Sequence, residues 1–276
     1  CGMPLVFLIK WYDPSVPITN RRRFLILPLW MDKLIGYHTL EAMNIGQYSN
    51  YKKDYDWSKY VEQKSRVRKI FDRVLKCNNL KDISNYNRYN DNEYCQEMVN
   101  QLKSENEKLY EIFGRYKEFD WEVHLRENNS VKNAVCAPGG SMNVFTGILR
   151  DIVANDDECA AVICHEIAHA ICRHRVERTQ LSCLIIALIS IAGYGFGIDL
   201  SWVFEKMLMF GISVMINLPK SRKAELEADE VGIHLLKNSG YNPRAMISLL
   251  DKLGKSQIIG NVVPEFLSTH PISQNR

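Results

Sequence analysis

The sequence predicts a mainly helical α+β protein that carries a small antiparallel sheet and an apolar helical hairpin. Apolar residues recur every three or four positions in residues 57–76, which is the period of an amphipathic helix. Residues 131–152 place two short apolar runs around a Pro-Gly-Gly turn, which is the pattern of a β-hairpin. Residues 181–219 are apolar with few charges, which indicates a pair of apolar helices.

The remaining elements follow from the same kind of pattern. A polar segment rich in Asn and Tyr near 77–95 reads as a surface loop, and a second helix is expected over 93–117. Residues 120–128 alternate apolar and polar side chains, as a half-buried strand does. An apolar helical run at 160–177 and an acidic helix at 221–236 complete the predicted elements.

The composition is that of a globular chain with a sizeable core. The chain has 276 residues, of which 46% are hydrophobic and 24% are charged. The net charge is only +3, and the basic clusters lack interleaved aromatic residues, so we expect no nucleic-acid binding. The eight cysteines follow no CxxC spacing, so a disulfide scaffold is not expected. Cys164 and Cys172 are expected to be small buried helix residues.

Two parts of unequal size are expected along the chain. Residues 1–50 form an N-terminal lead segment, and residues 51–276 form one domain with a polar inserted loop near 77–95 and an apolar hairpin at 181–219. The sequence begins at Cys1 without an initiator methionine. We therefore expect a longer protein whose upstream part holds a targeting signal or a membrane anchor.

The apolar hairpin has two interpretations. Residues 181–198 carry no charge and are long enough for a marginal membrane span, whereas Glu205 and Lys206 interrupt the second half of the hairpin. These charges and the glycines at 193–197 favour helices that pack on protein or lie at a membrane surface over a true crossing. Such a surface also favours self-association, so a homo-oligomer is a possible assembly of this chain.

The segment AAVICHEIAHAICRHRVE, at 160–177, places polar residues inside an apolar helix. A buried polar group costs free energy unless something pairs with it. His165 and His169 are four residues apart and share one helix face, so both imidazoles can bind one metal ion. Glu166 lies roughly 100° around the helix and can reach a water on that ion. This spacing predicts a catalytic zinc site in which Glu166 is the base.

The third metal ligand is expected on the acidic helix at 221–236. Catalytic zinc usually has three protein ligands, and a glutamate can be the third. Two acidic residues of this helix, Glu225 and Asp229, are four apart. One of them can therefore bind metal while the other accepts a hydrogen bond from a ligating imidazole. Taken alone, the acidic run would indicate a solvent-exposed helix face. Together with the two histidines, it favours a metal site.

Several segments in a fixed order carry a resemblance to a known family. They are NAVCAPGGSMNVFTGIL at 133–149, HEIAHA at 165–170, SRKAELEAD at 221–229 and STHPISQNR at 268–276. These segments resemble the membrane-linked zinc endopeptidases of the gluzincin type, which include CAAX prenyl proteases and the bacterial heat-shock membrane protease. The most similar branch is that of the stress-activated metalloendopeptidases of the mitochondrial inner membrane. The resemblance implies the gluzincin metallopeptidase fold.

The resemblance also implies roles for individual residues. The implied ligands of one Zn²⁺ per chain are His165, His169 and Glu225. Glu166 becomes the catalytic base, and Asp229 becomes the carboxylate that orients a ligating imidazole.

A second group of residues is expected to act on the substrate. His270 in STHP matches a family histidine near the active site, and we expect it to stabilise the developing oxyanion, with Tyr241 a weaker candidate. The run at 133–145 is expected to supply an edge strand that pairs with an extended peptide. The residues expected to bind substrate there are Asn133, Ala134, Val135, Gly139 and Gly140.

The resemblance implies a zinc endopeptidase that cleaves membrane-linked proteins in mitochondrial quality control or stress response. It places the chain at the mitochondrial inner membrane, with the catalytic domain facing the intermembrane space. Two alternatives stay open: a prenyl-protein protease of the endoplasmic reticulum, and a catalytically silent scaffold on the same fold. The complete set of base and ligands argues against the scaffold, because a scaffold has no need of Glu166.

Overall fold

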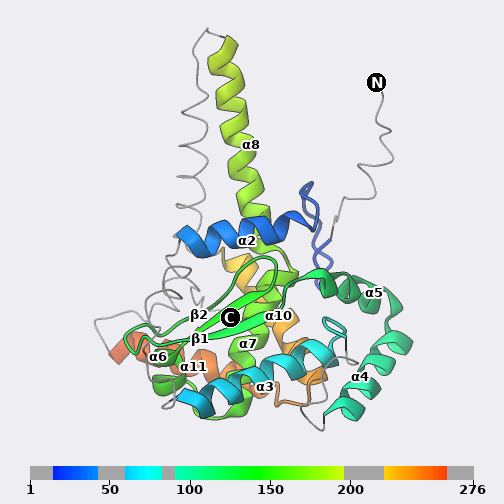
Figure 1. The fold of residues 1–276 in the computed structure, drawn as a ribbon, viewed down its shortest axis with the longest axis vertical. Helices are drawn as coiled ribbons and strands as arrows, with labels where there is room; N and C mark the ends of the chain where they lie inside the picture. The colour runs from blue at the N-terminus through cyan, green and yellow to red at the C-terminus, as the bar shows by residue number, and fades with distance from the viewer. Residues whose placement is uncertain (1–14, 43–59, 83–90, 196–220, 260–276) are drawn as a thin grey trace.

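A computed structural model describes residues 15–42, 60–82, 91–195 and 221–259 (Figure 1). Helices dominate this part of the chain, and a small sheet lies beside the central helix. In chain order the helices and strands are α2 (Met31–Ala42), α3 (Val61–Cys77), α4 (Asn92–Glu105), α5 (Glu107–Arg115), the 3-10 helix η3 (Tyr116–Glu118), β1 (Glu122–Arg126), β2 (Ala134–Cys136), β3 (Ser141–Phe145), α6 (Thr146–Asp151), α7 (Asp156–Ile171), α8 (His174–Gly195), α10 (Arg222–Asn238) and α11 (Arg244–Ile259).

Helix α7 is the centre of the core. Helices α3, α10 and α11 pack against it, and strand β2 lies along it as well (Figure 1). The amphipathic pattern predicted for 57–76 is confirmed, because α3 buries Ile70, Phe71, Val74 and Leu75. The core therefore forms around the helix that carries the two histidines.

The single helix predicted over 93–117 is in fact two helices. Asn106 ends α4 through its backbone N–H, which donates to the carbonyl of Leu102 at 2.9 Å. Its side chain then caps α5 by accepting the Leu109 N–H at 3.0 Å. Asn favours caps over helix interiors, so one residue ends the first helix and begins the second.

The sheet is mixed, so the prediction of an antiparallel sheet is wrong for one of its strands. The strand order is β1-β3-β2, and the predicted hairpin of β2 and β3 is confirmed as antiparallel, with Cys136 opposite Met142. Strand β1 runs parallel to β3, with Glu122 opposite Ser141. Alternation along residues 120–128 sets which side chains are buried, but it says nothing about strand direction.

The apolar helical run at 160–177 is divided at Arg173. This residue has a φ of 53°, in the left-handed region, which costs about 1–2 kcal/mol outside glycine. Its buried guanidinium donates to Asp32 at 2.6 and 3.0 Å, and to the carbonyls of Leu27 and Pro28 at 2.7 and 3.1 Å. These bonds compensate the strained backbone. Helix α7 therefore ends at Ile171, and α8 begins at His174 and extends away from the rest of the domain (Figure 1).

The described part of the lead segment packs on the domain. Gln180 of α8 accepts the backbone N–H of Ile26 at 2.6 Å and donates to the carbonyl of Phe24 at 2.9 Å. Helix α2 closes on the turn between β2 and β3, because a Cβ at Gly36 would lie only 1.9 Å from the Pro138 carbonyl oxygen. The division of the chain near residue 50 stays a prediction.

The apolar hairpin predicted at 181–219 stays a prediction, because only its first half belongs to the described residues. Helix α8 covers residues 174–195, and residues 196–219 lie outside the described part of the chain. None of the helices in the described ranges is long and apolar enough to cross a membrane.

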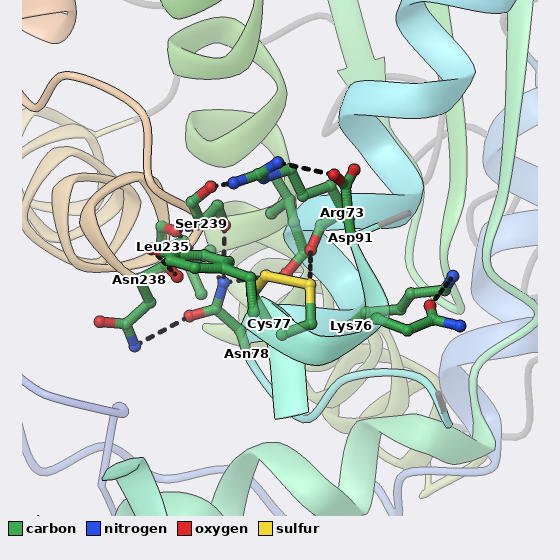
Figure 2. The surroundings of a disulfide bond; sticks show 12 residues. Arg73, Lys76, Cys77, Asn78, Asp91, Leu235, Asn238 and Ser239 are labelled. Atoms are coloured by element: carbon green, nitrogen blue, oxygen red, sulfur yellow. Dashed lines mark hydrogen bonds and ion pairs between the residues drawn. A yellow bond between two sulfur atoms is a disulfide. The ribbon is translucent and has the colours of Figure 1, made fainter. Parts of the chain in front are cut away.

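A disulfide joins Cys77 at the end of α3 to Cys95 near the start of α4 (Figure 2). The cysteine spacing did not predict it, because its two residues meet only when α3 and α4 pack together. Next to it, Asn78 donates to the carbonyl of Leu235 at 3.2 Å and to Ser239 Oγ at 3.1 Å (Figure 2). The disulfide thus lies beside the C-terminal end of α10. Buried positions for Cys164 and Cys172 are confirmed.

Candidate metal centre

The two histidines of the motif are placed by α7. Asn155 caps this helix by accepting the Glu158 N–H at 2.9 Å, an interaction worth about 1 kcal/mol. Three acidic residues in the first turn complement the positive end of the helix dipole. His165 and His169 lie on the face that packs against α10, and both side chains are buried. Their position deep in the core keeps bulk water away from the imidazoles.

The third predicted ligand meets the two imidazoles from α10. Ser221 caps α10 by accepting the Ala224 N–H at 3.2 Å, which places Glu225 in the first turn. Oε2 of Glu225 lies 3.5 Å from Nε2 of His165, and Oε1 of Glu225 lies 3.3 Å from Nε2 of His169. The two Nε2 atoms are 3.1 Å apart. Three donors from two helices therefore converge on one point.

The spacing of these donors fits a tetrahedral metal site. Zinc bonds of roughly 2.0–2.1 Å place the ligand atoms of a tetrahedron about 3.3 Å apart, because the separation is about 1.63 times the bond length. The two Nε2 atoms are 3.1 Å apart, and the carboxylate of Glu225 faces them with one oxygen each, at 3.3 and 3.5 Å. Two imidazoles and a carboxylate also form a donor set that catalytic zinc uses. The residues present thus fit the metal that the motif predicts.

The electrostatics of the site favour a positive charge. Burial lowers the pKa of His165, but hydrogen bonds and negative charge from Asp229 and Glu225 outweigh this effect and raise it to about 9. The same carboxylates would stabilise a bound cation at the imidazoles.

Glu166 lies beside the two histidines and is held by the sheet. Its carboxylate is within 4.8 Å of the donor atoms of His165 and His169. Its Oε2 accepts the backbone N–H of Cys136 in strand β2 at 3.0 Å. This bond holds the carboxylate between the metal site and β2, where a base acting on a metal-bound water would be needed.

Each imidazole has an outer partner on its second nitrogen. His165 Nδ1 lies 2.9 Å from Oδ1 of Asp229, in the arrangement predicted for the orienting carboxylate. His169 Nδ1 lies 2.8 Å from Nδ1 of His174, which the sequence analysis did not single out. The only signal was a histidine five residues beyond His169. Helical periodicity would have placed it on another face.

The residues predicted to bind substrate are all buried. They are Asn133, Ala134, Val135, Gly139 and Gly140. The two glycines form the turn between β2 and β3 with φ of 83° and 104°, which glycine adopts without strain. A Cβ on the first would meet Lys33, and one on the second would meet Trp121. The turn thus explains both glycines structurally, and a substrate role for them stays a prediction.

Strand β2 lies at an edge of the sheet, as predicted for a strand that pairs with a peptide. The backbones of Asn133 and Ala137 bond to β3 or its ends, so the alternate residues Ala134 and Cys136 direct their backbone groups outward. Their N–H groups are engaged: Ala134 donates to Asn133 Oδ1 at 2.9 Å, and Cys136 donates to Glu166. The outward carbonyl groups of β2 are therefore the backbone groups suited to a peptide N–H.

Of the two residues predicted for the oxyanion, only Tyr241 belongs to the described part of the chain. His270 lies outside the described residues. Tyr241 is half-buried and packs near the guanidinium of Arg73, 5.6 Å from the ring centre. Burial raises the pKa of the Tyr241 hydroxyl.

Comparison with known proteins identifies the family. Residues 97–276 match the profile of Peptidase family M48. The chain belongs to this family. The match covers the sheet, both metal-site helices and the Glu166 region, so the M48 assignment and the site geometry concern the same part of the chain.

Several similar proteins carry the name of a mitochondrial metalloendopeptidase. The mitochondrial metalloendopeptidase OMA1 of Arabidopsis thaliana is 34% identical over 178 residues, which cover 64% of this chain and 34% of the relative. OMA1 of Saccharomyces cerevisiae is 33% identical over 165 residues, covering 56% and 45%. The beta-barrel assembly-enhancing protease of Yersinia pestis is 30% identical over 155 residues, covering 54% and 32%. The chain spans less than half the length of these relatives.

Proposed function

We propose that this chain is the catalytic part of a zinc-dependent endopeptidase that cleaves membrane-linked proteins in mitochondrial quality control or stress response. The observation that carries the proposal is the convergence of His165, His169 and Glu225 at tetrahedral spacing with Glu166 beside them. Membership of family M48 and the metalloendopeptidase names of its relatives support the reaction.

In this proposal His165, His169 and Glu225 hold one Zn²⁺. Bound zinc lowers the pKa of a coordinated water toward about 7 and polarises the scissile carbonyl. Among the side chains of the site, Glu166 is proposed to transfer the proton. Glu166, which accepts the Cys136 N–H at Oε2, would take the proton of the water and deliver it to the leaving amine. Asp229 holds the His165 ring in the orientation that directs Nε2 at the metal.

The proposed substrate is an extended segment of a protein. Outward carbonyls of β2, such as that of Ala134, would accept its backbone N–H groups, which binds a peptide without demanding one sequence. His270 is proposed to donate to the oxyanion. The mitochondrial names of the relatives support a mitochondrial location, and the exposed leucines of α8 support contact with a membrane. We place this contact at the inner membrane, with the catalytic part in the intermembrane space.

Two alternatives lead to different results in the same assays. A prenyl-protein protease of the endoplasmic reticulum would cleave only substrates with a prenylated C-terminus. A catalytically silent scaffold would bind metal or partners without cleaving them. The position of Glu166 beside the metal donors favours an enzyme, because a scaffold has no use for a base there.

Metal analysis with a cleavage assay tests the proposal. The purified chain should contain about one zinc, and His165→Ala combined with His169→Ala should lose it together with cleavage of an unfolded, unprenylated protein. His124→Ala, on the half-exposed side of β1, is the matched control and should keep both properties. Zinc content unchanged in the double variant would contradict the assigned site.

A further inference from the structure

We propose that His174 is a positioning residue for the metal ligand His169, and that Glu227 and Arg21 hold His174 in place. The inference rests on the metal site proposed above. Nδ1 of His174 lies 2.8 Å from Nδ1 of His169, and its Nε2 lies 3.1 Å from Oε2 of Glu227. Oε1 of Glu227 accepts from Nε of Arg21 at 2.5 Å. Four side chains thus form one line of hydrogen bonds that ends at the metal ligand.

The donor and acceptor roles along this line follow from the metal ligation. His169 that binds metal through Nε2 carries its remaining proton on Nδ1, so it donates to Nδ1 of His174. His174 then carries its proton on Nε2 and donates to Glu227, whose other oxygen accepts from Arg21. Every polar atom on the line has a complementary partner, with both imidazoles neutral.

The break at Arg173 makes this contact possible. On an unbroken helix His174 would follow His169 by five positions, roughly 500° or 140° around the axis, so the two rings would point apart. The left-handed residue Arg173 turns the chain and returns the His174 ring to His169. The strained residue and its buried bonds to Asp32 thus serve the geometry of the metal ligand.

The line also reaches the N-terminal segment. Arg21 belongs to residues 15–27, which pack beside α8, and its remaining nitrogens donate to both oxygens of Glu177 at 2.9 and 2.7 Å. Glu227 and Glu177 thus hold Arg21 from two helices. Docking of this segment is thereby linked to the orientation of a ligand on α7.

Packing alone does not explain these residues. The side chains of His174 and Glu227 are only 3% and 7% exposed. Burying an ion pair such as that of Glu227 and Arg21 gains little or no stability over apolar side chains of similar volume. A polar line in the core that ends on a metal ligand is expected instead to orient that ligand, and such partners typically change metal affinity 10- to 100-fold.

Two isosteric substitutions separate orientation from packing. In His174→Asn the side-chain oxygen takes the place of Nδ1 and can still accept from His169, while the bond to Glu227 is lost. In His174→Gln the amide nitrogen takes the place of Nε2 and keeps Glu227, while the acceptor for His169 is lost. Zinc affinity of the full chain, measured by chelator competition, should fall about 10- to 100-fold in His174→Gln and much less in His174→Asn.

The role of Arg21, at the end of the hydrogen-bond line away from the metal, is tested by comparing substitutions of Arg21 and its neighbour Arg22. Arg21→Gln should weaken zinc binding by between about two- and tenfold, because it acts through Glu227 and His174. Arg22→Gln makes the same charge change at the adjacent exposed residue and should leave zinc affinity unchanged. The absorption spectrum of the Co²⁺-substituted chain should shift in His174→Gln and Arg21→Gln, and stay native in Arg22→Gln.

The possible results separate this inference from the proposed function. A native chain that binds no zinc contradicts the metal site itself. If the native chain binds zinc but His174→Gln binds it equally well, or if the Asn and Gln variants lose affinity equally while both stay folded, only the role of His174 is wrong. Equal effects of Arg21→Gln and Arg22→Gln would remove Arg21 from the line.

Discussion

At the scale of single residues, two glutamates of one helix have different partners. Glu225 faces both imidazole Nε2 atoms at 3.3 and 3.5 Å, whereas Glu227 faces His174 and Arg21. Residues two apart on a helix differ by roughly 200° in direction, so both carboxylates cannot reach one ion. The α10 backbone thus separates the proposed ligand Glu225 from Glu227, which is proposed to act through His174.

Substitution of each glutamate by glutamine should rank them. Glu225→Gln should weaken zinc binding by more than about 100-fold, beyond the range typical of residues that only orient a ligand. Glu227→Gln keeps the shape of the side chain and should cost about tenfold or less. Chelator competition measures both; a larger effect at Glu227 would mean that the third ligand is misassigned.

Glu166→Gln should separate metal binding from catalysis. The amide oxygen can still accept the Cys136 N–H, and the three ligands are untouched, so zinc content and the unfolding temperature should stay native. An amide cannot take the proton of a metal-bound water, so the rate of peptide cleavage should fall by at least about 100-fold. Undiminished cleavage would exclude Glu166 as the base.

At the scale of elements, the disulfide ties the α3–α4 unit together next to the end of α10. Cys77 and Cys95 are separated by 18 residues, and Asn78 beside them bonds to Leu235 and Ser239 of the α10 end (Figure 2). Glu225 lies in the first turn of α10, at its opposite end. We therefore expect the disulfide to stabilise the fold without directly setting the geometry of the metal ligands.

Cys77→Ser combined with Cys95→Ser should lower the free energy of unfolding by about 3 kcal/mol, the value expected for a loop of this length. Denaturant unfolding with and without reductant measures the change. The native chain should lose stability on reduction while the double variant should not respond. Zinc affinity of the folded variant should stay native, and a strong loss of affinity would contradict the separation of the two ends of α10.

At the scale of the whole molecule, α8 extends away from the domain (Figure 1). Leu181, Leu184 and Leu188 follow the spacing of one helix face and are 60%, 37% and 68% exposed. An exposed apolar face of this kind is typical of a surface that meets lipid or another chain. This apolar face belongs to the same helix as His174, which begins α8 beside the metal site.

Replacing these three leucines by serine should weaken binding to phospholipid vesicles by at least tenfold, since each buried leucine contributes about 1.5–3 kcal/mol. The fold and the cleavage of a soluble peptide should stay native. Val176→Ser, at a fully buried position of the same helix, is the contrast and should destabilise the fold. Vesicle co-sedimentation measures binding; native binding by the triple variant, or a change only in its oligomeric state, would contradict the lipid interpretation.

The sequence by itself determined the parts that depend on local geometry. A helix repeats every 3.6 residues, so the spacing of His165, His169 and Glu166 already placed two imidazoles on one face and a carboxylate beside it. Glu225 and Asp229 were paired by the same rule, and the structure brings all five together. The Pro-Gly-Gly turn likewise determined the β2–β3 hairpin, because its glycines adopt the positive φ that the turn requires.

Only the tertiary structure decided the parts that depend on how distant segments meet. The direction of β1, the pairing of Cys77 with Cys95 and the contact of Arg21 with Glu227 join residues that no short-range period relates. His174 is the clearest case, because helical periodicity places it away from His169. A left-handed Arg173, held by Asp32 from a helix far away in the sequence, reverses that placement through contacts made only in the folded chain.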